Sequence, residues 1–272
     1  MQDIALIIST TLMYSTPLIF AALGGVFSEN SGIVNIGIEG MMTIGAFAGA
    51  AAGYMLGNPW LAFIIGGLAG GLFALVHALA TVTFNADHTI SGVAINLLAP
   101  GVALFTSKIL FNGSVTTPTI PMENKIPRPL NGVFESGSIL DTIFNTYATT
   151  YIALALIVVV WFVLYKTKFG LRVRAVGEHP GAADTLGINV SRVRYISVIL
   201  SGILAGIGGA SMSLAIVSTF RPALISGQGY IALAAVIFGK WRPQWAGAAC
   251  LLFGFSTGLT VYLGNPSLGM TI

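Results

Sequence analysis

The chain turns basic at residues 166–195, KTKFGLRVRAVGEHPGAADTLGINVSRVRY, between two long apolar runs. This stretch holds six of the twelve Lys and Arg residues, whereas Glu178 and Asp184 are its only acids. Membrane proteins concentrate Lys and Arg in their cytoplasmic loops, so we expect residues 166–194 to form a cytoplasmic loop. Because apolar runs flank it on both sides, the basic cluster indicates topology rather than binding of a nucleic acid.

The same stretch predicts one short helix, from Pro180 to Leu186. Pro180 suits the first turn of a helix, where its missing N–H costs nothing. Gly187 suits the left-handed position just past the end, and Glu178 lies beside the positive N-terminal end. A helix of about two turns is marginal in water, so we expect it to dock on a cytosolic partner. The alternative is a solvated loop with a frayed turn.

The composition excludes an ordinary soluble domain. Of the 272 residues, 55% are hydrophobic and 8% charged, whereas a soluble domain has roughly a quarter of its residues charged. At roughly 20 residues per membrane-crossing helix, several crossings leave no room for a soluble catalytic domain. We therefore expect an all-α, polytopic transmembrane helical bundle of about eight spans in a single domain, residues 1–272.

The apolar runs give the expected topology. The candidate spans are residues 4–26, 32–56, 60–84, 90–110, 147–165, 195–219, 222–239 and 244–263. Five crossings before the basic stretch place the N-terminus outside. Periodicity leaves open whether 32–56 and 222–239 cross the membrane or turn back. The proline-rich stretch 112–141 is expected to be the largest external loop.

Small residues recur at four-residue spacing in three of these runs. The stripes are Gly45, Gly49 and Gly53; Gly66 and Gly70 with Gly67 and Gly71; and Gly202 and Gly206 with Ala205 and Gly209. Such stripes let helix backbones approach closely in a membrane. They predict a compact bundle.

A few polar residues interrupt the apolar runs. Asn35 and Glu39 are four residues apart and would share one helix face with Gly32. A carboxylate at bilayer depth is costly unless it faces a partner or water, so we expect Asn35, Glu39, Asn96 and Gln228 to line a substrate pathway. Alternatively, Glu39 pairs internally and locks the bundle. His77 is interpreted as a hydrogen-bonded packing residue.

The sequence lacks the motifs of several other functions. It has no paired catalytic carboxylates, no HExxH-like metal motif and no GxxxxGK[ST] motif. Its single cysteine, Cys250, cannot form a disulfide or a cysteine metal site within the chain. We therefore expect no enzyme activity, metal or cofactor here, and any ATP that drives transport must bind to another polypeptide.

The basic stretch resembles the coupling loop of ABC importer permeases, whose hallmark is a Glu, then small residues, then a Gly and an apolar residue. The matching residues are Glu178, Ala182, Ala183, Gly187 and Ile188. The resemblance is closest to the branched-chain amino acid, ribose and nucleoside group. Within it, SENSGIVNIGIEGMM (residues 28–42) and STFRPALISGQGYIALAAVIFGKWRP (residues 218–243) look like the versions in bacterial nucleoside importers.

The resemblance implies a multi-pass permease of the bacterial cytoplasmic (inner) membrane with a type II importer fold. It implies that Glu178 to Ile188 couples to a cytosolic ABC ATPase, which binds the ATP. It also implies a second permease subunit, similar or identical, and an extracytoplasmic solute-binding lipoprotein. Membrane lipid would surround the bundle. The resemblance favours a nucleoside as the solute, with ribose and branched-chain amino acids as alternatives.

Two alternatives stand outside this family. An ion-coupled secondary transporter also uses broken helices and a polar pair at the midplane, and Glu39 would then be its ion site. A membrane-embedded enzyme would use Glu39 and His77. Relatives generally continue through one or two further apolar segments after the region of Leu263, so we also expect this chain to lack C-terminal spans.

Overall fold

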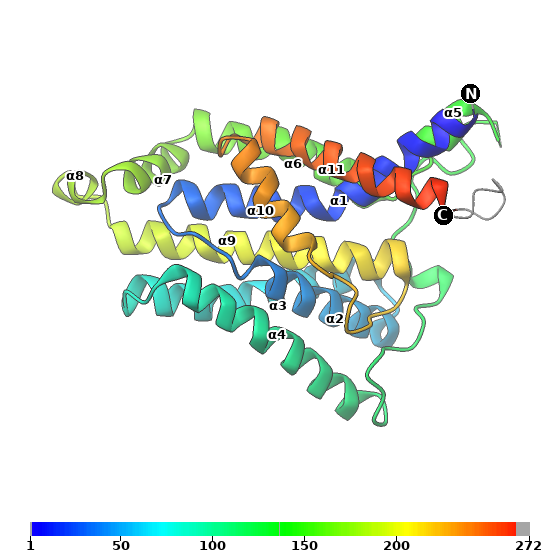
Figure 1. Ribbon diagram of the computed structural model, residues 1–272, viewed down its shortest axis with the longest axis horizontal. Helices are drawn as coiled ribbons and strands as arrows, with labels where there is room; N and C mark the ends of the chain where they lie inside the picture. The colour runs from blue at the N-terminus through cyan, green and yellow to red at the C-terminus, as the bar shows by residue number, and fades with distance from the viewer. Residues whose placement is uncertain (1, 136, 265–272) are drawn as a thin grey trace.

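The structure is a computed structural model that describes residues 2–135 and 137–264. Across these two ranges every regular element is a helix (Figure 1). The all-α fold expected from the composition is therefore confirmed.

Six helices are long and apolar enough to cross a membrane, counting each with the π-helical turn that continues it. They are α1 (Gln2–Asn30), α3 (Pro59–Ala78) with η1 (Leu79–Thr83), α4 (His88–Leu110), α6 (Ala148–Lys166), α9 (Val190–Ser211) with η3 (Met212–Val217), and α11 (Pro243–Leu263). Two further apolar helices, α2 (Ile38–Leu56) and α10 (Gln228–Phe238), occupy the remaining candidate spans. Each of the eight apolar runs thus contains one of these helices.

The shorter elements are η2 (Met122–Asn124), α5 (Ile139–Phe144), α7 (Lys168–Glu178) and α8 (Pro180–Thr185). The prediction of a single short helix in the basic stretch was incomplete, because α7 precedes the predicted one. The Thr167 hydroxyl caps α7 by accepting the Gly170 N–H at 3.2 Å. The helix buries Gly170, Val173 and Val176, which are three residues apart on one face. This spacing is the sequence signal that was missed.

The two ends of the bundle differ in charge. Helices α7 and α8 lie at one end, whereas α5 and the N-terminus lie at the other (Figure 1). The first end, here called the basic end, carries eight of the twelve Lys and Arg residues: Lys166, Lys168, Arg172, Arg174, Arg192, Arg194, Lys240 and Arg242. By the positive-inside tendency we expect the basic end to face the cytoplasm. The N-terminus at the opposite end agrees with five crossings before the basic stretch.

The centre of the bundle is built where α2, α3 and α9 cross. A Cβ atom on Gly66 would lie 2.8 Å from the Gly45 carbonyl oxygen, and one on Gly70 would lie 2.7 Å from the Gly206 Cα. A Cβ on Gly202 would likewise meet the Gly70 carbonyl at 2.7 Å. Only glycine permits backbones to touch in this way, so the glycine stripes act as the sequence predicted. These contacts fix α2, α3 and α9 relative to one another.

Candidate translocation pathway and coupling surface

The segment between α1 and α2 is not helical. Residues 31–37 run from the basic end back into the bundle, where α2 begins (Figure 1). Gly32 adopts a φ of +85°, a left-handed conformation that glycine tolerates. The expectation that Asn35 and Glu39 share a helix face is therefore wrong, because Asn35 lies in this non-helical segment and α2 starts only at Ile38.

Two histidines bind the backbone of this segment. His77 Nε2 lies 3.3 Å from the Val34 carbonyl oxygen, and its Nδ1 lies 2.9 Å from the Ser91 hydroxyl. The Val34 N–H donates to His88 Nδ1 at 3.4 Å. Non-helical backbone at membrane depth persists only when protein or water satisfies its polar groups. His77 is fully buried, as its interpretation as a hydrogen-bonded packing residue predicted.

Asn96 of α4 joins the end of this segment to the start of α2. Its Nδ2 donates to the Ile36 carbonyl at 2.9 Å, and its Oδ1 accepts the Gly40 N–H at 2.8 Å. The Nδ2 also donates to the Tyr230 hydroxyl of α10 at 2.9 Å. One half-buried amide therefore binds the irregular segment, the start of α2 and the start of α10 at one point.

Glu39 makes the second link between α2 and α10. Its two carboxylate oxygens accept the N–H groups of Gly227 and Gly229, each at 2.7 Å. Gly227 has a φ of +92° and begins α10. Both helices thus direct their N-terminal ends at one carboxylate, which their dipoles stabilise. The structure therefore has Glu39 bonded internally, the arrangement described in the alternative interpretation.

Of the other two residues predicted for the pathway, Asn35 is more enclosed than Glu39 and Asn96, whereas Gln228 is half-buried as they are. Asn35 is fully buried, and its Nδ2 donates to the Ser201 hydroxyl of α9 at 2.9 Å. Gln228 lies at the start of α10. The Oδ1 of Asn35 and the Oε1 of Gln228 are buried without a hydrogen-bond partner. These two side chains keep unused acceptors at the depth where α2 and α10 begin.

The structure brings Glu39, Asn96 and the first turn of α10 together, although 188 residues separate Glu39 from Gly227. It adds Tyr230, which sequence reasoning missed and which is 48% exposed. Tyr230 follows the GQG motif directly, but an aromatic residue in an apolar run carries no polar signal by itself. We call Glu39, Asn96 and Tyr230 the polar cluster.

The second candidate surface is α8 at the tip of the basic end (Figure 1). Pro180 occupies its first turn, and Gly187 follows its end with a φ of +76°. The Ile188 N–H donates to the Ala183 carbonyl at 3.1 Å, and the Gly187 N–H donates to the Asp184 carbonyl at 2.8 Å. These two bonds form a Schellman motif, which ends a helix. The helix is as predicted, but it ends at Thr185, one residue early.

The side chains of α8 and its flanks divide into an inner and an outer set. Ala183 is buried and Ile188 is half-buried against the core. Glu178, Ala182 and Gly187 are exposed. Leu186 is 81% exposed although it is apolar.

A helical bundle with six apolar spans, two interrupted segments that meet inside it, and an exposed helix at its basic end has the architecture of a transport permease. Over residues 7–272 the chain matches the family described as the branched-chain amino acid transport system / permease component. The chain belongs to this family. It is a permease subunit of an ABC transporter in the bacterial inner membrane, and it is not the subunit that hydrolyses ATP.

The chain is similar to several ABC transporter permeases. It is 47% identical over 272 residues to the guanosine ABC transporter permease protein NupQ of Bacillus subtilis, covering 96% of this chain and 83% of that protein. It is 44% identical over 280 residues to the nucleoside ABC transporter permease protein NupC of Lactococcus lactis, covering 97% and 84%. The putative glucose ABC transporter permease protein TsgC13 of Haloferax volcanii is 36% identical, covering 97% and 79%. No solved structure matches the chain.

Proposed function

We propose that this chain forms one half of the membrane pathway of an ABC importer for nucleosides, and that the polar cluster lines that pathway. The observation that carries the proposal is the position of the cluster. Glu39 and Asn96 are partly exposed at the depth where α2 and α10 begin inside the bundle, and Tyr230 is exposed beside them. Lipid cannot solvate these groups, since a carboxylate facing hydrocarbon costs several kcal/mol.

The polar cluster must therefore contact protein or water rather than lipid. A second permease subunit, identical or similar, would enclose this face and leave a water-filled path between the two halves. Asn35 and Gln228, whose side-chain oxygens are buried in this structure, would reach a solute only after the surrounding helices move. An ion-coupled secondary transporter is disfavoured, because family membership assigns the energy source to an ATPase and because both oxygens of Glu39 already bind backbone N–H groups.

The chemistry of the cluster favours an uncharged solute. An amino acid carries an ammonium and a carboxylate, and each needs an opposite charge in a membrane. The only carboxylate here is committed to the N-terminus of α10. The exposed hydroxyl of Tyr230 can instead bind a hydroxyl group or a base edge, and its ring can stack on a base. The nucleoside and guanosine permeases among the relatives support the same choice over ribose and branched-chain amino acids.

The exposed residues in and beside α8, here called the coupling surface, support a proposal for the partners. We infer that Glu178, Ala182, Gly187 and Leu186 contact a cytosolic ABC ATPase, while Ala183 and Ile188 anchor α8 to the permease. The ATPase would bind ATP, so the permease needs no cofactor of its own. An extracytoplasmic solute-binding lipoprotein would deliver the nucleoside at the opposite end of the bundle.

The first experiment is to purify the tagged protein gently from its native membrane and to measure uptake after reconstitution of what copurifies. We expect an ATPase and a permease to copurify in equal amounts. Labelled guanosine should be taken up, and unlabelled nucleosides, but not leucine or ribose, should compete with its uptake. A chain that transports without an ATPase would overturn the proposal. Competition by leucine or ribose alone would overturn the substrate assignment and leave the importer intact.

Glu178→Lys tests the coupling surface. Glu178 is exposed, so the variant should insert and assemble while ATP hydrolysis no longer drives uptake. Glu123→Gln, on the opposite end of the bundle, is the matched control and should transport normally. Coupled uptake by Glu178→Lys at the rate of the unmodified transporter would refute the role of this residue.

A further inference from the structure

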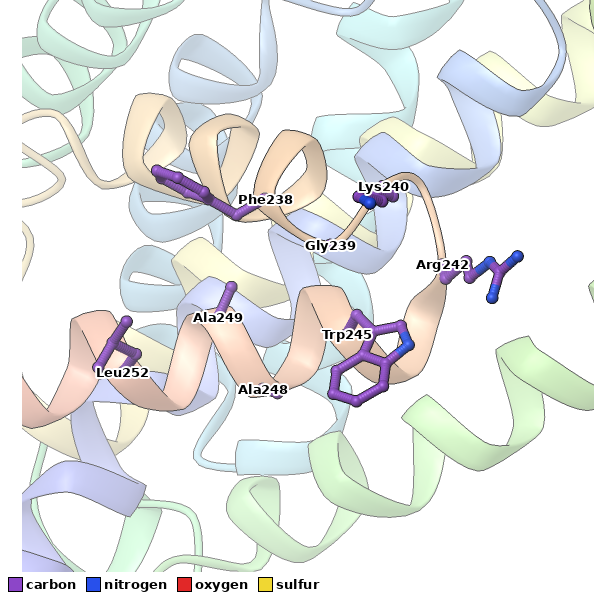
Figure 2. Close-up of a pocket in the computed structure, with 8 residues that line it drawn as sticks. All are labelled: Phe238, Gly239, Lys240, Arg242, Trp245, Ala248, Ala249 and Leu252. Carbon is purple, nitrogen blue, oxygen red and sulfur yellow. The ribbon is translucent and has the colours of Figure 1, made fainter.

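A groove of about 640 Å³ lies between α10 and α11 at the basic end of the bundle (Figure 2). It is lined by Phe238, Gly239, Lys240, Arg242, Trp245, Ala248, Ala249 and Leu252. None of these residues belongs to the polar cluster or to α8. The groove is thus separate from both surfaces described above.

The groove is amphipathic along its length. Lys240 and Arg242 lie on the turn that joins the two helices, whereas Leu252 lies further along α11 (Figure 2). Phe238 is 72% exposed, and Leu252 is 64% exposed. The indole of Trp245, 60% exposed, lies between the charged and the apolar parts. Tryptophan prefers this boundary between headgroups and hydrocarbon in a membrane protein.

The groove itself is lined by cations, although Lys240 also lines a neighbouring pocket that contains Glu29 and Glu178. No acidic side chain is among the groove's lining residues in the described part of the chain. The nearby carboxylate of Glu29 accepts the Trp241 indole N–H, and neither residue lines the groove. Two cations that line one groove at the cytoplasmic membrane boundary attract an anion to it.

Lys240 occupies a position where glycine would be easier. The Trp241 N–H donates to the Val236 carbonyl at 3.1 Å, and the Lys240 N–H donates to the Ile237 carbonyl at 2.9 Å. These bonds form a Schellman motif with Lys240 at its left-handed position, at a φ of +50°. That position usually holds glycine or asparagine. The neighbouring Trp241 also has a positive φ, +57°, so the whole turn is held in an uncommon backbone conformation.

We propose that this groove binds an anionic phospholipid of the cytoplasmic leaflet. The phosphate lies between Lys240 and Arg242, the glycerol region lies against Trp245, and an acyl chain follows Phe238, Ala249 and Leu252. Charge complementarity and the separation of charged from apolar lining both select a lipid over a soluble anion. The proposal does not depend on which solute the importer carries.

Native mass spectrometry of the assembled transporter, delipidated and titrated with phosphatidylglycerol or phosphatidylcholine, tests the proposal. We expect phosphatidylglycerol to bind in preference. The double variant Lys240→Asn/Arg242→Gln should lower this preference by about 25-fold, about five-fold for each charge removed near the surface. Asparagine is chosen because it tolerates the left-handed conformation. Lys166→Gln is the matched control, since Lys166 lies at the same end beside Trp161 but does not line this groove.

Ala248→Trp tests the shape of the groove while both of its cations remain. Ala248 is exposed on α11, so the larger side chain should fill the groove without disturbing the core, and phosphatidylglycerol binding should fall although both cations remain. Equal binding of the two lipids, or a preference that Lys166→Gln lowers as much as the double variant, would mean non-specific annular lipid and would overturn the proposal. Efficient disulfide crosslinking of Leu252→Cys between two permease subunits would also overturn it, because the second subunit would then cover the groove.

Discussion

The Glu39 carboxylate accepts the Gly229 N–H at 2.7 Å, and this bond joins the first turn of α2 to the first turn of α10. The other carboxylate oxygen accepts the Gly227 N–H at the same distance. Two helices that begin inside the bundle are thus bound at their N-terminal ends. If α10 moves during transport, the starts of α2 and α10 either move together or lose these two hydrogen bonds. Substitutions at this junction therefore test the proposed pathway.

Replacing Glu39 should loosen α10. Glu39→Ala leaves two enclosed N–H groups without acceptors, at a cost of about 1–3 kcal/mol each. Glu39→Gln keeps one acceptor and loses the charge that the two helix dipoles stabilise, so its loss should be smaller. Thermal unfolding in detergent should rank the unmodified protein above Glu39→Gln and Glu39→Ala last. If Glu39→Ala has the same melting temperature as the unmodified protein but loses uptake, the carboxylate acts on the solute and does not stabilise the junction.

Gly229→Ala tests the same junction from the other helix. The added Cβ atom would lie 2.5 Å from the Glu39 Cα and 2.8 Å from its Oε2. Backbone must shift to relieve such a contact, at a cost of about 1–3 kcal/mol. Gly101→Ala in α4 is the matched control, because nothing lies within 4 Å of its added Cβ. The control should melt at or above the temperature of the unmodified protein, and equal melting of both variants would contradict the close contact.

The start of α4 makes stability depend on pH. The Asp87 carboxylate caps this helix by accepting the Thr89 and Ile90 N–H groups at 2.8 and 2.9 Å. The hydrogen bond from the Ile90 backbone is the main cause that lowers the pKa of Asp87 below its ordinary value. A lowered pKa in the folded state means that the charged cap stabilises the protein above the ordinary pKa. This contribution is lost as the pH falls through the lowered value.

Asp87→Asn removes that dependence, because asparagine also caps helices but does not titrate. Melting temperatures measured from pH 7 to pH 3 should fall more for the unmodified protein than for the variant. The two curves should diverge only below about pH 4, where an ordinary aspartate protonates. Curves that run parallel over the whole range would contradict the capping role.

The sequence predicts the spans and α8 because their signals are local. Apolar runs, glycine spacing, Pro180 at a helix start and Gly187 past its end each act within one or two turns. The start of α2 was mispredicted because apolar composition continues through residues 31–37. What keeps this segment irregular is distant: His77 and Asn96 come from α3 and α4 and bind its carbonyl groups. The pairing of Glu39 with Gly227 is equally non-local, so a sequence can nominate Glu39 but cannot name its partner.

Gly187 should matter for coupling more than for folding. Its φ of +76° disfavours a residue with a Cβ by about 1–2 kcal/mol, so Gly187→Val should break the Schellman motif and displace Ile188 from the core. The transmembrane helices do not depend on this turn, and the variant should insert and reach the membrane normally. Gly181→Ala, within α8 and with nothing within 4 Å of the added Cβ, is the control for local change. We expect Gly187→Val to lower ATP-driven uptake at least ten-fold and to recover less ATPase on purification, whereas Gly181→Ala keeps its ATPase. Normal uptake by Gly187→Val would mean that coupling to the ATPase does not depend on the position of α8.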